Sequence, residues 1–196
     1  VKVLAERANI PLPQPQMTGQ ALALEKQRSR LFQMHKEAGR FYYDILQSKE
    51  GEAARAYLER RQLHPNIARK FGIGYAPERR HALYDFLREK GYSTEDILHS
   101  GLVLADKDAG GYHDRFRGRV MFPIFDAQGR VVGFGGRILG KGEPKYLNSP
   151  ETVLFSKSRN LYGLNFAKAA RKKELILVEG YMDMISIYQA GFPNVV

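Results

Sequence analysis

The spacing of apolar residues changes along this chain, from a helical pattern in the first half to a strand pattern in the second. Apolar residues between Leu31 and Ile45 recur every three or four positions, which predicts one long amphipathic helix over residues 22–47. Stretches with the same period predict shorter helices at residues 52–61, 65–71, 80–90, 94–99 and 161–173.

Beyond residue 100 the pattern favours extended chain. The apolar runs 120–125 and 130–137 flank the tight connection 126–129, which predicts a β-hairpin. Pro123 cannot donate a backbone hydrogen bond, so the first strand of this hairpin is expected at a sheet edge or at a bulge. Shorter strands are expected at residues 73–75 and 102–104.

The C-terminal part combines strand and helix signals. Four consecutive aliphatic residues, Leu175 to Val178, predict a short strand that is buried on both faces. Residues 184–189 predict a helix, and Asn194 to Val196 read as the first residues of another strand. This order predicts the beginning of a βαβ unit.

These patterns divide the chain into three segments. The alternating prolines in Pro11–Pro15 hold the backbone extended, so residues 1–21 are expected to be a linker from a preceding domain. Residues 22–173 predict a mixed helical and antiparallel subdomain, and residues 174–196 the first βα unit of a truncated α/β domain. The fold class is therefore α/β, of the α+β kind. Because the sequence begins at Val1 rather than Met, we expect a piece of a longer protein.

Composition narrows the chemistry. The 196 residues are 43% hydrophobic, which suffices for one good core. There are no cysteines, which excludes disulfides and a cysteine-ligated zinc site, and the five histidines lack metal-ligand spacing. No apolar stretch approaches the roughly 20 residues of a membrane span. The net charge of +10 favours a polyanionic partner, although many proteins carry such charge only for solubility.

Two carboxylates follow the predicted C-terminal strand. Glu179 lies at the strand end and Asp183 in the first helical turn, where ligands of open α/β sheets gather. Acids placed there suit a divalent metal or proton transfer. The same two positions also suit helix capping and the helix dipole, so both interpretations remain open.

Basic residues and glycines gather around the hairpin. Arg115, Arg117 and Arg119 alternate, so they share one face if this stretch is extended. Three glycines within residues 133–136 let another backbone or a sugar-phosphate chain approach closely. We therefore expect a nucleic-acid surface at the hairpin.

The segment Lys145–Asn148 sets a cation, an aromatic ring and an amide close together. A cation binds phosphate, a ring stacks on a base, and an amide bonds phosphate, sugar or base, which suits a single-stranded nucleic acid. A turn with a packed tyrosine and a solvated lysine is the competing interpretation.

Five segments follow one another in a fixed order: Arg115–Ile124, Gly133–Arg137, Pro144–Thr152, Leu161–Gly163 and Val178–Asp183. Together they resemble the catalytic core of bacterial replicative DNA primases of the DnaG type, over about residues 25–196. The resemblance implies an RNA polymerase core with a TOPRIM domain. Such enzymes make short RNA primers on a single-stranded DNA template from nucleoside triphosphates.

The resemblance also implies roles for individual residues. Glu179 matches the TOPRIM glutamate, a metal ligand for Mg²⁺ or Mn²⁺ and a possible general acid or base, and Asp183 matches the acid that follows it. The implied nucleic-acid or nucleotide contacts are Arg61, Arg115, Arg117, Arg137, Lys145, Tyr146 and Asn148.

Other implied parts do not occur in this sequence. They are the Asp-x-Asp metal motif of TOPRIM domains, a zinc-binding domain before the core and a helicase-binding domain after it. The replicative helicase and the single-strand binding protein are expected to contact such parts, at a replication fork in the bacterial cytoplasm. We expect no membrane contact, and no activity from this piece alone.

Two alternatives remain open. One is another TOPRIM enzyme, a nuclease or topoisomerase, and the segment Lys145–Pro150 argues against it. The other is a binding module without chemistry, which uses its arginines as a nucleic-acid surface.

Overall fold

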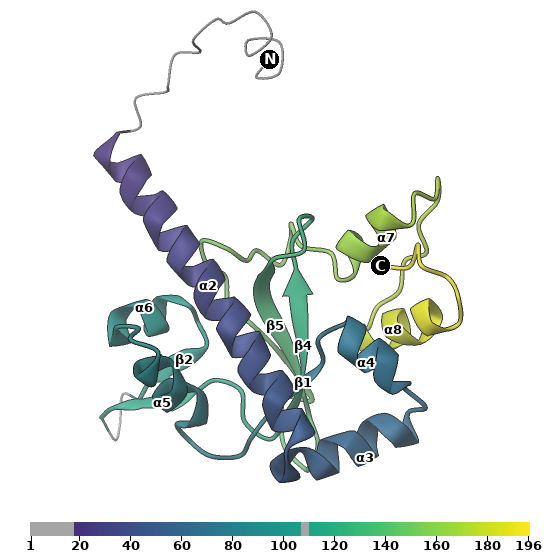
Figure 1. Cartoon of the computed structure of the whole chain (residues 1–196), viewed down its shortest axis with the longest axis horizontal. Coiled ribbons are helices and arrows are strands. Elements are labelled where there is room, and N and C mark those ends of the chain that lie inside the picture. Colours follow the sequence, from purple (N-terminus) through teal and green to yellow (C-terminus); the bar gives the residue numbers. More distant parts are fainter. Residues whose placement is uncertain (1–17, 107–109) are drawn as a thin grey trace, which may run out of the picture.

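The computed structural model describes residues 18–106 and 110–196 (Figure 1). Its longest element is helix α2, Gly19–Gln47, whose first turn is capped by the Thr18 hydroxyl accepting from the Ala21 backbone N–H. The predicted helix over 22–47 is confirmed, with a start three residues earlier. The predicted linker lies outside the described residues except at its last four positions, where Gly19 to Ala21 are helical.

Helix α2 crosses a four-stranded antiparallel sheet in the order β1-β4-β5-β6. The strands are β1 (Gly74–Ala76), β4 (Arg119–Phe125), β5 (Val131–Ile138) and β6 (Tyr146–Asn148). The predicted hairpin is confirmed as β4–β5.

The position of Pro123 in β4 satisfies both expectations for a proline in a strand. Strand β1 pairs only with residues 119–121, so Pro123 lies beyond the end of its neighbour on that side. The register between β4 and β5 shifts directly after it, between Ile124 and Phe125, which is a bulge.

One face of the sheet packs against α2. Met121 and Phe134 lie on this face and join a buried cluster with Met34, Ala38 and Tyr42. The Phe134 and Tyr42 rings meet edge to face at 5.4 Å. The helix comes so close to β1 that a Cβ on Gly74 would lie 2.6 Å from the Tyr42 backbone, which explains a glycine at that position.

The other face is covered by three helices, α3 (Glu52–Arg60), α4 (Pro65–Lys70) and α8 (Tyr181–Gln189). Val120 and Phe122 of β4 lie in this second cluster with Phe71. Ile185 of α8 belongs to it too, so the C-terminal segment shares apolar packing with the earlier part of the chain. The domain boundary expected at residues 173/174 stays a prediction.

A smaller layer flanks α2 on its other side. It contains α5 (Ala82–Glu89), α6 (Thr94–His99) and a two-stranded sheet of β2 (Val103–Ala105) with β3 (Tyr112–Asp114). The buried Asp114 carboxylate accepts from the backbone N–H groups of Leu83 and Tyr84, and so caps α5 from another element. A 3₁₀ turn η1 (Lys49–Gly51) follows α2, and α7 (Leu164–Ala169) is shorter than the helix expected at 161–173.

The predicted strand 175–178 differs from the expectation in its burial. Leu175 is 53% exposed and Leu177 74%, so the prediction of burial on both faces is wrong. Alternate residues of an extended segment point to opposite sides, and in the described part of the chain only the side of Ile176 and Val178 is packed. Ile176 pairs in parallel with Val195, which confirms the expected start of a βαβ unit.

In residues 18–106 and 110–196, no helix combines the length and the hydropathy needed to cross a membrane.

Candidate nucleic-acid interface

A tyrosine of α3 holds two arginines at the sheet surface. Tyr57 and Arg61 are four residues apart, and the Arg61 guanidinium carbon lies 5.6 Å from the centre of the Tyr57 ring. The Arg137 guanidinium of β5 lies over the same ring at 4.4 Å. Tyr57 itself is 8% exposed, so it is a fixed platform that places both cations.

Arg137 also has an aromatic neighbour on the adjacent strand. Tyr146 of β6 is its partner in the β5–β6 register, and its ring centre lies 5.9 Å from the Arg137 guanidinium. Among the described residues, Arg137 forms no ion pair, and its buried Nε has no hydrogen-bond partner. Stacking positions this guanidinium without using its N–H donors, and Tyr146 remains 39% exposed.

The amide of Asn148 has a fixed orientation. The Tyr181 hydroxyl donates to Asn148 Oδ1 at 2.7 Å, so the NH₂ group of this amide remains as a donor. Burial, with a smaller contribution from Tyr146, raises the pKa of Tyr181 to about 12, and the hydroxyl therefore keeps its proton at neutral pH. The Tyr181 ring stacks on Phe122 at 5.3 Å, which ties the start of α8 to the sheet.

The glycines of β5 do not serve the purpose expected of them. A Cβ on Gly135 would lie 2.5 Å from the Tyr181 ring, and one on Gly136 would lie 2.8 Å from Phe116. The space above these glycines is filled by aromatic rings of this chain. The prediction that they admit a sugar-phosphate chain is therefore wrong, and they are needed for internal packing.

Arg115, Arg117 and Arg119 were expected on one face of an extended stretch, but they do not share one. Residues 115–118 are irregular, with Gly118 at φ +59°, and this breaks the alternation. Arg119 is only 6% exposed, and its Nη1 donates to the backbone carbonyls of Gly136 and Pro144 at 3.2 and 2.9 Å. The guanidinium of Arg115 donates to the carbonyl of Asn148 at 3.2 and 2.9 Å.

These arginines line a pocket of about 350 Å³. Its charged residues are Arg115, Arg117, Arg119, Lys141, Glu78 and Glu143. In the described chain, none of the three arginines forms an ion pair. Burial lowers the pKa of Arg115 and of Arg119, and repulsion from Arg115 lowers the pKa of Arg119 further. Guanidinium groups stay charged throughout the neutral range, so the pocket is positive overall, with three arginines and Lys141 against Glu78 and Glu143.

The expected nucleic-acid surface is thus divided into two basic surfaces. Arg137 and Tyr146 lie on the sheet face covered by α3 and α8, whereas Arg119 follows the opposite register, toward α2. Asn148 contacts both surfaces, since its backbone carbonyl meets Arg115 and its side chain meets Tyr181. The side chain of Lys145 is exposed beside them.

The two predicted acids are exposed. Glu179 directly precedes the N-cap Gly180 of α8, and Asp183 lies in the first turn. A Cβ on Gly180 would lie 2.7 Å from Asp183 Oδ2, so this carboxylate folds back over the positive end of the helix. Neither acid has a hydrogen-bond or ion-pair partner in the part of the chain described.

Carboxylate oxygens have the right chemistry for Mg²⁺. However, no group of three or more His, Cys, Asp or Glu side chains gathers within the described ranges in a way that could hold a metal ion. Glu179 and Asp183 therefore fit part of a magnesium site, and their roles stay predictions.

Sequence reasoning gave no role to Tyr57 and Tyr181. Tyr57 precedes Arg61 by four residues, which is a readable helical signal. The contact of Tyr181 with Asn148 spans 33 residues, and no local pattern indicates it.

Residues 41–168, more than half of the chain, match the family model described as "DNA primase catalytic core, N-terminal domain". This match defines the class, a primase catalytic core. The chain belongs to that family, and its relatives identify it as part of a bacterial DnaG-type primase.

Sequence and structure relatives agree with the family. A DNA primase of Clostridium acetobutylicum is 43% identical over the whole chain, which spans 32% of that protein. The structure of a DnaG primase catalytic domain bound to ssDNA has 41% identity and a TM-score of 0.79, covering 87% of this chain and 56% of that one. The RNA polymerase domain of Mycobacterium tuberculosis DnaG has 39% identity and a TM-score of 0.80, covering 86% and 55%.

The chain spans about a third of the length of the curated relatives it matches.

Proposed function

We propose that this chain is the template- and nucleotide-binding part of a DNA primase, a nucleotidyltransferase that synthesises short RNA primers on single-stranded DNA from nucleoside triphosphates. The observation that carries the proposal is Arg137, held between the rings of Tyr57 and Tyr146 with its donors unused. The ssDNA bound to the related DnaG catalytic domain supports it.

Each group on this face has a distinct task. The exposed Tyr146 ring stacks on a base, an interaction worth about 1–3 kcal/mol in single-strand binders. Arg61, Arg137 and Lys145 donate to phosphate oxygens, and the oriented NH₂ of Asn148 donates to a phosphate, sugar or base acceptor. The tyrosine platform keeps the guanidinium groups in place before the strand arrives, which lowers the entropy lost on binding.

The pocket of Arg115, Arg117 and Lys141 takes a further phosphate of the same strand. Strand β6 ends the sheet, and Arg119 and Ile138 of this pocket lie on the opposite sheet face from Arg137. A single strand that bends around β6 contacts both surfaces, and phosphate is the ligand that guanidinium groups bind best.

The metal site of this enzyme begins at Glu179. Glu179 would hold Mg²⁺ or Mn²⁺ together with carboxylates beyond the two described here, and Asp183 would hold a proton or a metal-bound water beside it. The bound ion supplies polarisation of the triphosphate and a lower pKa for the primer 3′ hydroxyl. We assign zinc, helicase and single-strand binding protein contacts to other parts of the protein, and place it at the replication fork in the bacterial cytoplasm.

A binding experiment tests the surface. Arg137→Ala should weaken binding of a fluorescein-labelled (dT)₁₅ about tenfold and lower the salt slope of log K by about 1. Arg28→Ala is the matched control, because Arg28 is an exposed arginine near the start of α2, and it should change affinity less than twofold. Equal affinity of both variants would remove Arg137 from the interface.

A synthesis experiment tests the chemistry. In the longer protein, Glu179→Gln should abolish primer formation on single-stranded DNA and leave (dT)₁₅ affinity unchanged. Unreduced synthesis would refute the role of Glu179. In the longer protein without this substitution, template cleavage instead of primer formation would indicate a nuclease or topoisomerase, and binding without any synthesis would indicate a passive module.

A further inference from the structure

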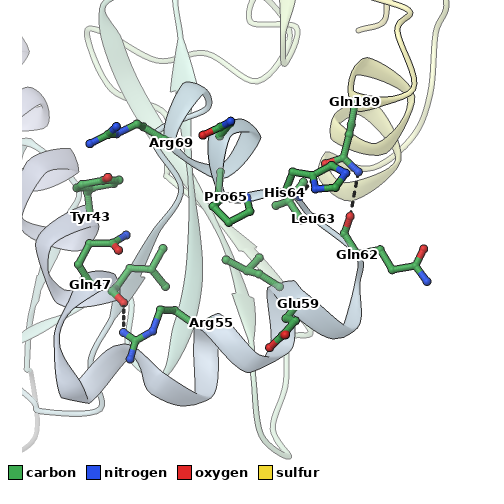
Figure 2. Close-up of a pocket in the computed structure, with 14 residues that line it drawn as sticks. Tyr43, Gln47, Arg55, Glu59, Gln62, Leu63, His64, Pro65, Arg69 and Gln189 are labelled. Atoms are coloured by element: carbon green, nitrogen blue, oxygen red, sulfur yellow. Dashed lines mark hydrogen bonds between the residues drawn. The ribbon is translucent and has the colours of Figure 1, made fainter.

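A second cavity of the described chain lies on the other side of α3 from Tyr57. It measures about 850 Å³ and lies between the C-terminal end of α2, helix α3 and helix α4 (Figure 2). Arg55, Leu58 and Glu59 line it from one face of α3, since they recur every three or four residues, and Gln62 lines it from the turn after this helix. Tyr57 lies on the opposite face, so the cavity is separate from the nucleic-acid surface.

The cavity has an aliphatic floor. Leu46, Leu58 and Leu63 line it, and each is less than a tenth exposed. Tyr43 and His64 are its aromatic lining residues, in contrast to the tyrosines that gather around Arg137. An aliphatic floor suits an aliphatic side chain and offers a nucleobase little to stack on.

The rim carries unused amides. The side chains of Gln47, Gln62 and Asn66 line the cavity without a hydrogen-bond partner in the described residues. Gln189 of α8 is different: its amide accepts from the His64 N–H at 2.8 Å and donates to the Gln62 carbonyl at 2.9 Å, which fixes the wall (Figure 2). Side-chain amides both donate and accept, as the backbone of a bound peptide requires.

The charge around the rim favours an acidic ligand. Arg55 and Arg69 line the cavity against a single acid, Glu59. Arg55 is anchored, since its Nη1 donates to the carbonyls of Leu46 and Ser48, whereas the exposed Arg69 has no acidic partner among the residues described.

We infer that this cavity is a docking site for a short acidic peptide segment of a partner protein, with one leucine-like side chain on the Leu46–Leu58–Leu63 floor and a carboxylate at Arg69. The site is a protein contact and goes beyond the proposed nucleic-acid function. A ligand in the cavity would contact the same helix that positions Arg137, because α3 carries the cavity on one face and Tyr57 on the other.

Amide NMR spectra of the whole chain test the inference with four probes: acetyl-Glu-Leu-Glu-Leu-amide, the same peptide with Ala for Leu, the same peptide with Lys for Glu, and AMP. The acidic leucine peptide should shift the side-chain amides of Gln47, Gln62 and Asn66. The alanine and lysine peptides should each bind at least about fivefold more weakly.

A charge reversal provides the second arm. Arg69→Glu should weaken the acidic peptide at least about fivefold. Arg60→Glu makes the same change on an exposed α3 residue that does not line the cavity, and it should leave affinity within twofold. Both variants change exposed residues, so their folded spectra should match that of the parent.

Several results would overturn the inference. They are the absence of shifts at 5 mM peptide, shifts centred on Tyr146, equal binding of the lysine peptide, equal loss in both variants, or tighter binding of AMP at the same amides. Because (dT)₁₅ binding uses the opposite face of α3, such failures leave the proposed function intact.

Discussion

The molecule holds two of its arginines in different ways, one on each side of the sheet. Arg137 rests on the rings of Tyr57 and Tyr146 and has no hydrogen bond within the described ranges. Arg119 is buried and donates to backbone carbonyls of the hairpin and of the segment after it. The first arrangement leaves donors for a ligand, while the second uses them to hold the fold.

This contrast shows why the residue type alone does not identify a binding residue. Both arginines follow a glycine in the sequence, Gly118 before Arg119 and Gly136 before Arg137. A stacked guanidinium is available for phosphate, whereas one that satisfies buried carbonyls is needed for stability. Stability and binding measurements should therefore separate the two classes.

The largest expected effect is on stability. Arg119→Ala should lower the free energy of unfolding by about 3 kcal/mol, because the carbonyls of Gly136 and Pro144 lose charged donors and a cavity remains. Urea unfolding measures this. Arg117→Ala, an exposed neighbour, should change it by less than about 0.5 kcal/mol. Equal losses in both variants would erase the distinction.

An effect of similar size concerns pH and the α2 side of the sheet. Burial lowers the pKa of His35 to about 4, so its contribution to stability is lost as pH falls from 6.5 toward 4. Burial raises the pKa of Asp114 to about 6, so its contribution is lost as pH rises from 4 toward 6. The two slopes oppose each other, and the parent protein should be nearly pH-independent in this range.

Single variants should reveal the two opposing pH dependences of the free energy of unfolding. His35→Leu should lose stability as pH rises from 4 to 6.5, and Asp114→Asn should gain it, each by up to about 3 kcal/mol. Urea midpoints at several pH values measure this. Binding of (dT)₁₅ should not follow these changes, since burial raises the pKa of Tyr181 to about 12 and its hydroxyl keeps its proton throughout this range.

Next in size is the loss of the exposed ring. Tyr146→Ala should weaken (dT)₁₅ binding by about 1–3 kcal/mol, while the free energy of unfolding changes by less than about 1 kcal/mol. Fluorescence anisotropy and urea unfolding give the two numbers. A variant that lost stability but kept its affinity would place Tyr146 with Arg119 and not with Arg137.

The smallest effect tests orientation. Tyr181→Phe keeps the stack on Phe122 but removes the hydrogen bond to Asn148, so the amide is free to rotate. We expect (dT)₁₅ affinity to fall two- to fivefold, about 0.5–1 kcal/mol. Asn148→Ala should abolish the difference between Tyr and Phe at position 181. A persisting difference would show that the hydroxyl acts elsewhere.

Local patterns predicted the elements well. The spacing of apolar residues placed α2 and the β4–β5 hairpin, and the proline indicated the edge position and the bulge that are both present. These features depend on residues close in sequence. The resemblance to DnaG-type primases pointed to Arg61, Arg137 and Tyr146, and these three residues do gather at one surface.

Contacts between distant segments were beyond such patterns. Gly135 accommodates Tyr181, 46 positions away in sequence, so its purpose was misread as an opening for a ligand. The arginines after β3 were expected on one face because nothing local announces the positive φ of Gly118. Likewise, four consecutive aliphatic residues indicate a buried strand. Only the packed fold shows that the side chains of Leu175 and Leu177 lie on the uncovered side of it.

The bond from Arg115 to Asn148 has one more consequence. Strand β6 is the last strand of its sheet, and the outward carbonyl of such a strand invites pairing with a strand of another molecule. Arg115 occupies that carbonyl with two donors, and its charge repels an identical edge. The contact thereby protects the chain against edge-to-edge aggregation, so a variant at Arg115 should be judged by its solubility as well as by its DNA affinity.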